Sequence, residues 1–239
     1  METPSSSYDL RVHRCKFLSW KPSGIEAMAY SPENKFCAVI RSNSNVEIWK
    51  VEQWNLIVTF PGSKSWSLRK VAFMPKNIDA DLNMEEESLS HYSIIGSGLN
   101  GFMFEFDCNS LQPIQHEEVE GGGIWDFDIY SNKLIATAGD DGFVRIYKKK
   151  YNKPFKFLKR LPQAKDKTLS VSWSHDGSAI AAGYADSSIR KWEVDSLKCV
   201  LTIDNELATN KDRALIWQLE LFQDGTIVSG DSKGWIKFW

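Results

Sequence analysis

The segment DGFVRIY at residues 141–147 decides the fold, because four other stretches repeat its pattern of a polar turn, a short apolar strand and a large aromatic. They are NSNVEIW (43–49), NGFMFEF (100–106), DSSIRKW (186–192) and KGWIKFW (233–239). Each strand is expected to end on its aromatic, at Trp49, Phe106, Tyr147, Trp192 and Trp239, with intervals of 57, 41, 45 and 47 residues. A four-stranded blade takes about 40 to 45 residues, so the spacing predicts repeated sheet units and one insertion.

The position six residues before the aromatic holds a short polar side chain in four of the five repeats. Such a side chain can hydrogen-bond its own turn and tolerates a left-handed backbone. We therefore expect structural turn residues at Asn43, Asn100, Asp141 and Asp186, whereas Lys233 breaks the series in the last repeat.

Apolar runs with few charges precede each turn, as in KFCAVIRS, KLIATAG and AIAAGYA. Such runs are typical of strands buried on both faces. Alternating segments come before them and polar segments follow the aromatics, so the order along each blade is inner, middle, middle and outer strand. This order predicts an all-β propeller with about five blades, roughly at residues 23–60, 67–119, 122–161, 167–204 and 214–239. Most of the ten tryptophans are expected to pack between blades.

The turn, the branched strand and the closing aromatic together resemble the signature of WD repeats. The chain departs from that pattern because the Gly-His dipeptide is missing ahead of the inner strands. The side-chain hydrogen-bond tetrad of a typical WD blade is therefore expected to be incomplete.

A closer likeness begins with VHRCKFLSWKPSGIEAMAYSPENKFCAVIRSNSNVEIWKVEQW at residues 12–54 and continues through GSGLNGFMFEFD and GGGIWDFDIY to the end of the chain. These stretches resemble the cirhin family of WD-repeat proteins. The resemblance implies that residues 12–239 are part of an N-terminal, seven-bladed propeller and that the chain is a fragment of a longer one. Composition and spacing predict a flexible N-terminus at 1–11 and an acidic loop insertion at 75–91. Closure of the propeller predicts that VHRCKFL (12–18) is the outer strand of the last blade.

The same resemblance implies a nucleolar, non-catalytic scaffold of the early t-UTP (UtpA) subcomplex of the small-subunit processome. Such a scaffold supports pre-rRNA transcription and processing in early small-subunit (18S) assembly, with the other processome subunits as partners. An alternative is a substrate-recruiting WD-repeat adaptor of a ubiquitin ligase. The Trp-Asp-x-Arg element of such adaptors is missing, because Trp192 is followed by Glu193, Val194 and Asp195.

A basic stretch lies between Arg145 and Lys167, with ten Lys or Arg against one Asp. Aromatic residues interrupt it, and this mixture is expected where phosphates are neutralised and bases stack. The simpler interpretation is an outer strand with solvated lysines. Such lysines protect the edge of the sheet from pairing with another sheet. The candidates for contact with pre-rRNA or protein are Lys148, Lys149, Lys150, Lys153, Lys156, Lys159 and Arg160.

Composition predicts a globular protein that stays inside the cell. The net charge is −2, 42% of residues are hydrophobic and 25% are charged, and no run approaches 18 apolar residues. The start of the chain lacks the apolar centre of a signal peptide, so no membrane partner is expected. The four cysteines form no CxxC pair and are expected to be reduced thiols rather than metal ligands.

The sequence predicts no catalytic residue, no cofactor, no metal and no small-molecule substrate. The four histidines are scattered among the repeats, and no nucleophile, phosphate-loop or dinucleotide motif occurs. Asp126 and Asp128 alternate along IWDFDIY and should face the central channel, where polar lining is expected rather than an acid–base pair. The glycines at 121–123 precede a strand and are expected to form a crossing between blades.

Overall fold

The computed structural model describes residues 23–76, 88–108, 112–204 and 213–239. Residues 1–11, the proposed outer strand at 12–18 and most of the acidic insertion lie outside the described residues. Pro75, which the sequence assigned to the insertion, is the last residue of a strand, and Leu89–His91 forms a single 3-10 turn, η2.

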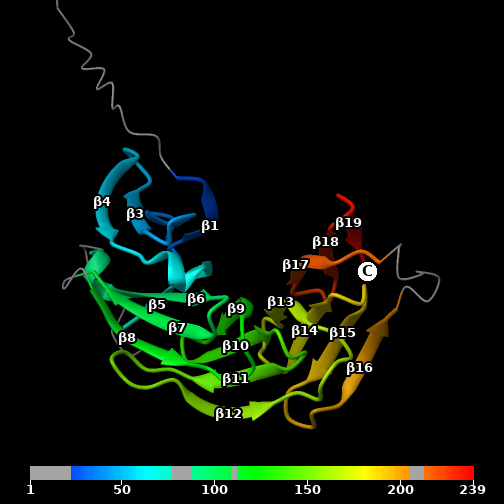
Figure 1. Cartoon of the computed structure of the whole chain (residues 1–239). Coiled ribbons are helices and arrows are strands. Elements are labelled where there is room, and N and C mark those ends of the chain that lie inside the picture. Colours follow the sequence, from blue (N-terminus) through cyan, green and yellow to red (C-terminus); the bar gives the residue numbers. More distant parts are fainter. Residues whose placement is uncertain (1–22, 77–87, 109–111, 205–212) are drawn as a thin grey trace, which may run out of the picture.

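Nineteen strands in the described residues form five antiparallel sheets, so the predicted all-β propeller of about five blades is confirmed (Figure 1). Blade 1 holds β1 (Ile25–Tyr30), β2 (Phe36–Arg41), β3 (Val46–Lys50) and β4 (Asn55–Phe60). Blade 2 holds β5 (Leu68–Pro75), β6 (Tyr92–Gly98), β7 (Phe102–Asp107) and β8 (Gln112–Glu118), and blade 3 holds β9 (Ile124–Tyr130), β10 (Leu134–Gly139), β11 (Val144–Lys148) and β12 (Lys156–Arg160). Blade 4 holds β13 (Thr168–Trp173), β14 (Ala179–Tyr184), β15 (Ile189–Glu193) and β16 (Cys199–Ile203), and blade 5 holds β17 (Ile216–Leu221), β18 (Ile227–Asp231) and β19 (Ile236–Phe238).

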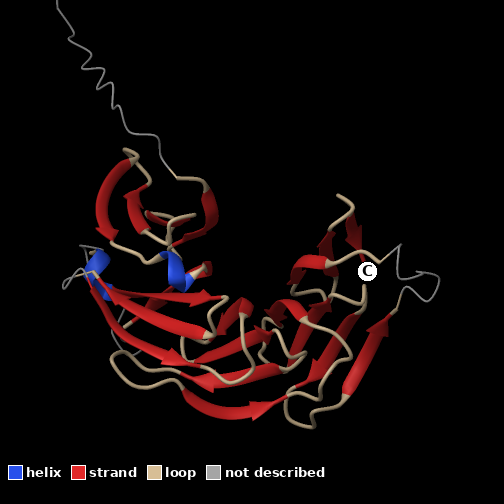
Figure 2. Cartoon of the chain, viewed as in Figure 1, coloured by secondary structure: helices blue, strands red, loops and turns tan. Residues whose placement is uncertain are grey.

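The five blades form an arc that is open between blade 1 and blade 5 (Figures 1 and 2). The inner strands β1, β5, β9, β13 and β17 are neighbours in that order along the inside of the arc. The lower edge is the side of the blades that carries two kinds of connection. These are the turns between first and second strands, such as 131–133, and the loops between third and fourth strands, such as 149–155. The upper edge carries the turns between second and third strands, such as 140–143, and the connections from one blade to the next.

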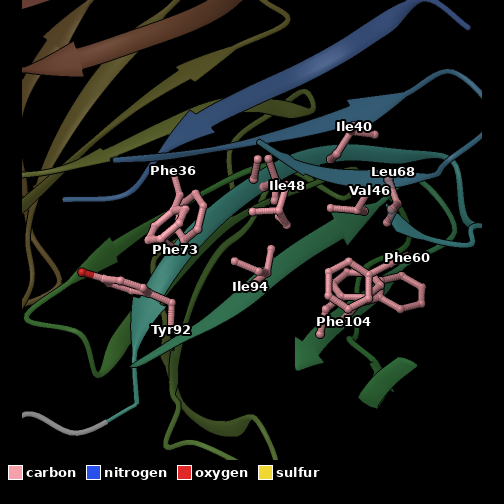
Figure 3. Close-up of a cluster of buried hydrophobic side chains, with 13 residues drawn as sticks. Phe36, Ile40, Val46, Ile48, Phe60, Leu68, Phe73, Tyr92, Ile94 and Phe104 are labelled. Atoms are coloured by element: carbon pink, nitrogen blue, oxygen red, sulfur yellow. The ribbon is translucent and has the colours of Figure 1, made fainter. Parts of the chain in front are cut away.

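A separate hydrophobic cluster fills each of the four junctions between neighbouring blades. The first joins blades 1 and 2 through β2, β3, β4, β5, β6 and β7 (Figure 3). In it the Phe60 and Phe106 rings lie 5.2 Å apart, and the Phe73 and Tyr92 rings meet edge to face at 5.7 Å. Because every central blade packs on both faces, its middle strands are almost wholly buried, as the apolar runs predicted.

The closing aromatics differ by one residue from the predicted strand ends. Trp49, Phe106, Tyr147 and Trp192 are each followed by one more strand residue, and Trp239 follows β19. Phe106, Tyr147 and Trp192 are buried in the junction with the preceding blade. Trp239 is 47% exposed, because β19 is the last strand of its sheet in the described residues.

The turn residues act through the side-chain oxygen that accepts the amide hydrogen two positions later. Asn43 accepts from Asn45 at 3.1 Å and Asp186 from Ser188 at 2.9 Å, and Asn100 and Asp141 do the same with Phe102 and Phe143 at 3.2 Å. In blade 5 the carboxylate comes from a different position. Asp231 accepts from the amides of Lys233 and Trp235 at 3.0 and 3.1 Å, so an upstream residue replaces the missing turn acid.

Candidate functional site

A cavity of about 420 Å³ opens on the lower edge between blades 2 and 3. The end of β5, the turn between β9 and β10 and the loop between β11 and β12 form its walls. Its lining is dominated by lysine, with one tyrosine. The six lysines are Lys76, Lys133, Lys148, Lys149, Lys150 and Lys153, and the aromatic residue is Tyr151.

Lys149 anchors the loop from the inside of this wall. Its ammonium group is fully buried and lies 2.6 Å from Glu105 Oε2 on β7 of blade 2. It also donates hydrogen bonds to the carbonyl oxygens of Lys150, at 3.0 Å, and of Lys153. Burial lowers the pKa of Lys149, and the Glu105 carboxylate opposes that shift. Lys149 is therefore not available to a ligand, which corrects its assignment as a contact residue.

Other bonds complete the anchor on the blade 2 side. Glu105 Oε1 accepts from Ser93 Oγ at 2.6 Å and from the backbone amide of Asn152 at 3.4 Å. The amide of Phe155 donates to Glu117 Oε2 at 2.9 Å, and the Phe155 ring packs 4.7 Å from the Lys149 ammonium. The loop 149–155 is thus tied to blade 2 near both of its ends, which fixes the position of the lysines between them.

Four other lysines of the cavity are exposed or partly exposed. Lys148, Lys150 and Lys153 are exposed and Lys133 is partly buried. None of these four forms an ion pair with a carboxylate of the described residues. The cavity wall is therefore strongly positive, although the whole chain has a net charge of −2.

Lys76 and Tyr151 complete the lining of the cavity. The Lys76 ammonium pairs with Asp107 and lies 4.7 Å from the centre of the Tyr151 ring. The Tyr151 hydroxyl is 3.5 Å from the same carboxylate of Asp107. These contacts hold the tyrosine ring, which is partly buried, at the cavity.

The other predicted contact residues lie elsewhere, on the outer strand β12. Lys156 and Arg160 are exposed, and the Arg160 guanidinium lies 4.6 Å from the centre of the Phe143 ring. Lys159 donates to the carbonyl oxygen of Val194 at 2.6 Å, in blade 4. The structure therefore divides the seven predicted residues into three cavity lysines, one buried anchor and three outer-strand residues.

The sequence pattern missed Lys76 and Lys133 as members of this cluster. Lys76 directly follows β5, and Lys133 lies in the turn before β10. Because neighbouring strands of a blade run in opposite directions, both positions lie on the lower edge. The loop after β11 lies on the same edge. If each basic residue had been assigned to an edge of its predicted blade, Lys76 and Lys133 would have been grouped with the loop lysines. These are Lys148, Lys150 and Lys153.

Asp126 and Asp128 hold the inner strands of two neighbouring blades together. Asp126 Oδ2 accepts from the amide of Val171 at 3.1 Å, and Asp128 Oδ2 accepts from that of Trp173 at 2.8 Å. Lys70 Nζ lies 2.9 Å from the other oxygen of Asp126. Burial raises the pKa of both carboxyl groups, against the effect of Lys70 and these amides. The pair has a structural role between blades 3 and 4.

Groups suited to metal binding do not gather in the described parts of the chain. No three His, Cys, Asp or Glu side chains there are placed to share a metal ion. Burial raises the pKa of the Cys108 thiol to about 12, so this thiol is protonated at neutral pH. Among the described residues no helix has the length and apolar character needed to cross a membrane.

Comparison with known proteins agrees with the repeat pattern. Residues 130–220, from the end of β9 to near the end of β17, match the model of the anaphase-promoting complex subunit 4 WD40 domain. The human U3 small nucleolar RNA-associated protein 4 homolog is 28% identical over 236 residues, which cover 97% of this chain and 32% of that protein. Residues 130–220 are therefore similar to a WD40 domain, and almost the whole chain is similar to part of the human protein.

Two fungal relatives give the same result. U3 small nucleolar RNA-associated protein 4 of Schizosaccharomyces pombe is 28% identical over 242 residues, covering 95% of this chain and 32% of the relative. The protein of that name from Saccharomyces cerevisiae is 27% identical over 248 residues, covering 95% and 30%. The chain spans about a third of the length of the curated relatives it matches.

Proposed function

We propose that this chain is a non-catalytic scaffold in ribosome biogenesis, of the cirhin family. It supports pre-rRNA transcription and processing in early small-subunit (18S) assembly, in the nucleolus, as part of the t-UTP (UtpA) subcomplex of the small-subunit processome. The observation that carries the proposal is the similarity to U3 small nucleolar RNA-associated protein 4 of human and two yeasts along 95 to 97% of the chain.

The architecture supports a scaffold more than an enzyme. The blades are rigid because hydrophobic clusters fill each junction between them, and loops leave the blades at two edges. Loops on a rigid support are well suited to binding several partners at fixed relative positions. We propose that other processome subunits bind such loops and that pre-rRNA is reached through the lysines of the lower edge.

Co-purification tests this proposal. The chain, tagged and expressed in cells of its source organism, is expected to enrich U3 small nucleolar RNA and other processome subunits over a tagged unrelated WD-repeat propeller. Light microscopy of the same cells is expected to show the tag in nucleoli. If the tagged chain recovered a ubiquitin-ligase scaffold and no processome subunit, the adaptor alternative would replace the proposal.

A further inference from the structure

The lower-edge cavity concentrates positive charge that the protein itself does not neutralise. Lys133, Lys148, Lys150 and Lys153 surround about 420 Å³ of open space, and none pairs with a carboxylate of the described residues. Like charges that share a concave, partly desolvated surface repel one another and raise the local potential. An anion that enters the cavity relieves this repulsion.

The cavity is also built in advance of binding. Lys150 and Lys153 lie in a loop whose backbone is tied down by the buried Lys149–Glu105 pair, by the amide of Asn152 and by the amide of Phe155. Lys148 is the last residue of β11, and Lys133 lies in the turn before β10. A ligand therefore does not have to order the loop, and this saving strengthens binding. Lys149 is a positioning residue, because its charge is used inside the wall.

The cations of the wall are suited to phosphate. All six basic residues of the wall are lysines. The planar fork of arginine binds carboxylates and phosphates alike, whereas the ammonium group of lysine binds a phosphate as a point charge, in any orientation. Four such groups around one opening exceed what a single phosphate needs, so the ligand carries several phosphates.

Tyr151 indicates a nucleic acid among the anions with several phosphates. Its ring lines the cavity between the lysines and is held by Lys76 and Asp107. Stacking of a base on an aromatic ring next to a lysine-lined backbone path is the usual mode of binding to single strands. Paired bases are not free to stack on a side chain, so this arrangement favours a single strand over a duplex.

We propose that the cavity between blades 2 and 3 binds single-stranded RNA, with phosphates on Lys133, Lys148, Lys150 and Lys153 and one base on Tyr151. The inference deepens the proposed scaffold function and rests on it for the choice of RNA over DNA. The affinity of the cavity can be measured without any assembly partner.

Binding of a fluorescein-labelled 12-nucleotide oligouridylate to the intact purified chain tests the charges. The variant K148A/K150A/K153A is compared with K156A/R160A/K198A, which removes the same charge from exposed positions outside the cavity. The first variant is expected to weaken binding at least tenfold, and the second less than twofold. The slope of log affinity against log salt should fall by about 2 in the first variant only, since each phosphate contact contributes about 0.7.

Equal losses in the two variants would show that the RNA follows diffuse charge, and this result would overturn the proposal. Circular dichroism and thermal unfolding of both variants verify that each is folded. The variant Y151A is expected to lose about fivefold or more in affinity and Y151F less than twofold, because stacking requires the ring and not the hydroxyl. Identical affinities of Y151A and the parent chain would contradict the stacking role.

Competition separates RNA from other phosphorylated ligands. A serine peptide with two phosphates is expected to displace the oligouridylate only at more than tenfold excess. Displacement at equal concentration, with the same dependence on Lys148, Lys150 and Lys153, would assign the cavity to a phosphopeptide instead. If the chain binds RNA as expected but enriches no processome subunit from cells, the proposed function fails while the RNA site stands.

Discussion

The upper and lower edges of blades 2 and 3 use their charged residues in opposite ways. On the upper edge the cations have partners: Arg145 lies 2.6 Å from Asp141, Lys167 2.6 Å from Asp140, and Arg69 2.9 Å from Glu26 of blade 1. On the lower edge Lys133, Lys148, Lys150 and Lys153 surround a cavity without a carboxylate partner among the described residues.

This difference separates charges that maintain the fold from charges that are available for binding. The Arg145–Asp141 pair fixes a turn, and its stabilising contribution is present whether or not a partner protein binds. The lysine cluster contributes no stabilising pair, and its charge is neutralised only when an anion enters. Two pairs are exceptions on the lower edge, Lys76–Asp107 and Lys149–Glu105, and the second is fully buried and holds the cavity in shape.

The largest predicted effect comes from breaking that anchor. Replacing Lys149 by Met leaves the Glu105 carboxylate buried without its cation, which is expected to lower the free energy of unfolding by about 3–5 kcal/mol. The matched variant K150M, one residue away but exposed, should change it by less than about 0.5 kcal/mol. Urea unfolding followed by tryptophan fluorescence measures both, and similar values for the two variants would mean that the pair is not an anchor.

The upper-edge turn at Gly142 should give the next largest effect. Its φ of +80° is in the left-handed region, and a Cβ there would lie 2.7 Å from the carbonyl oxygen of Asp166 and 2.9 Å from that of Ala164. We expect G142A to cost about 2–4 kcal/mol, the sum of left-handed strain and overpacking. Gly225 has a φ of +91° with nothing within 4 Å of its Cβ position, so G225A carries the strain alone and should cost about 1–2 kcal/mol.

Thermal unfolding of the two glycine variants gives the comparison directly. A smaller loss for G142A than for G225A would contradict the close approach of the blade connection to this turn.

A pH dependence is predicted for Asp141. Burial acts to raise the pKa of this carboxyl group, but hydrogen bonds from Arg145 and from the amide of Phe143, together with the charge of Arg145, outweigh it and hold the pKa below its ordinary value. The ionised carboxylate therefore stabilises the fold at pH values above the pKa of Asp in the unfolded chain, which is about 4. This contribution is lost as the pH falls through the lower pKa of Asp141 in the folded state.

The variant D141N should accordingly lose about 1.5–3 kcal/mol at pH 7, the range for a hydrogen bond to a charged group. The difference from the parent chain should shrink as the pH falls below about 4. Urea unfolding of D141N and of the parent chain at several pH values measures this difference in the free energy of unfolding. A difference that is constant from pH 7 down to the start of acid unfolding would show that the lost interaction is not that of the carboxylate.

The smallest effect should come from the lysine cluster itself. Removing three like charges in K148A/K150A/K153A is expected to raise the free energy of unfolding by a few tenths of a kcal/mol at low salt, because repulsion is relieved. The gain should vanish at about 1 M salt, where the screening length is about 3 Å. Differential scanning calorimetry at both salt concentrations measures this, and a loss of stability at low salt would show that these lysines have a structural role.

The sequence predicted the blades well because their determinants are local. The turn residues, the apolar runs and the aromatic of each repeat lie within about a dozen residues, and each fixes its own hairpin. The exception in blade 5 is also local, since Asp231 lies only two residues before Lys233 and supplies the turn acceptor in its place.

The site was harder to predict because its determinants are distant in sequence. Lys149 was grouped with its exposed neighbours, yet its partner Glu105 lies 44 residues away in another blade. Lys149 is buried whereas Lys148 and Lys150 are exposed, but β11 ends at Lys148, so the alternation of the strand does not extend to Lys149. Composition alone cannot distinguish these two kinds of lysine.

Ultraviolet cross-linking of uridine-rich single-stranded RNA to the intact chain, read by mass spectrometry, tests the central claim most directly. The exposed aromatic residues offer alternatives at other places, with Trp217 on the upper part of blade 5 at 41% exposure and Phe157 on the outer strand at 48%. We predict that the modified peptide is the one that contains Tyr151, in the loop 149–155. Cross-links confined to Trp217 or Phe157, with none in that loop, would contradict the assignment of the lower-edge cavity.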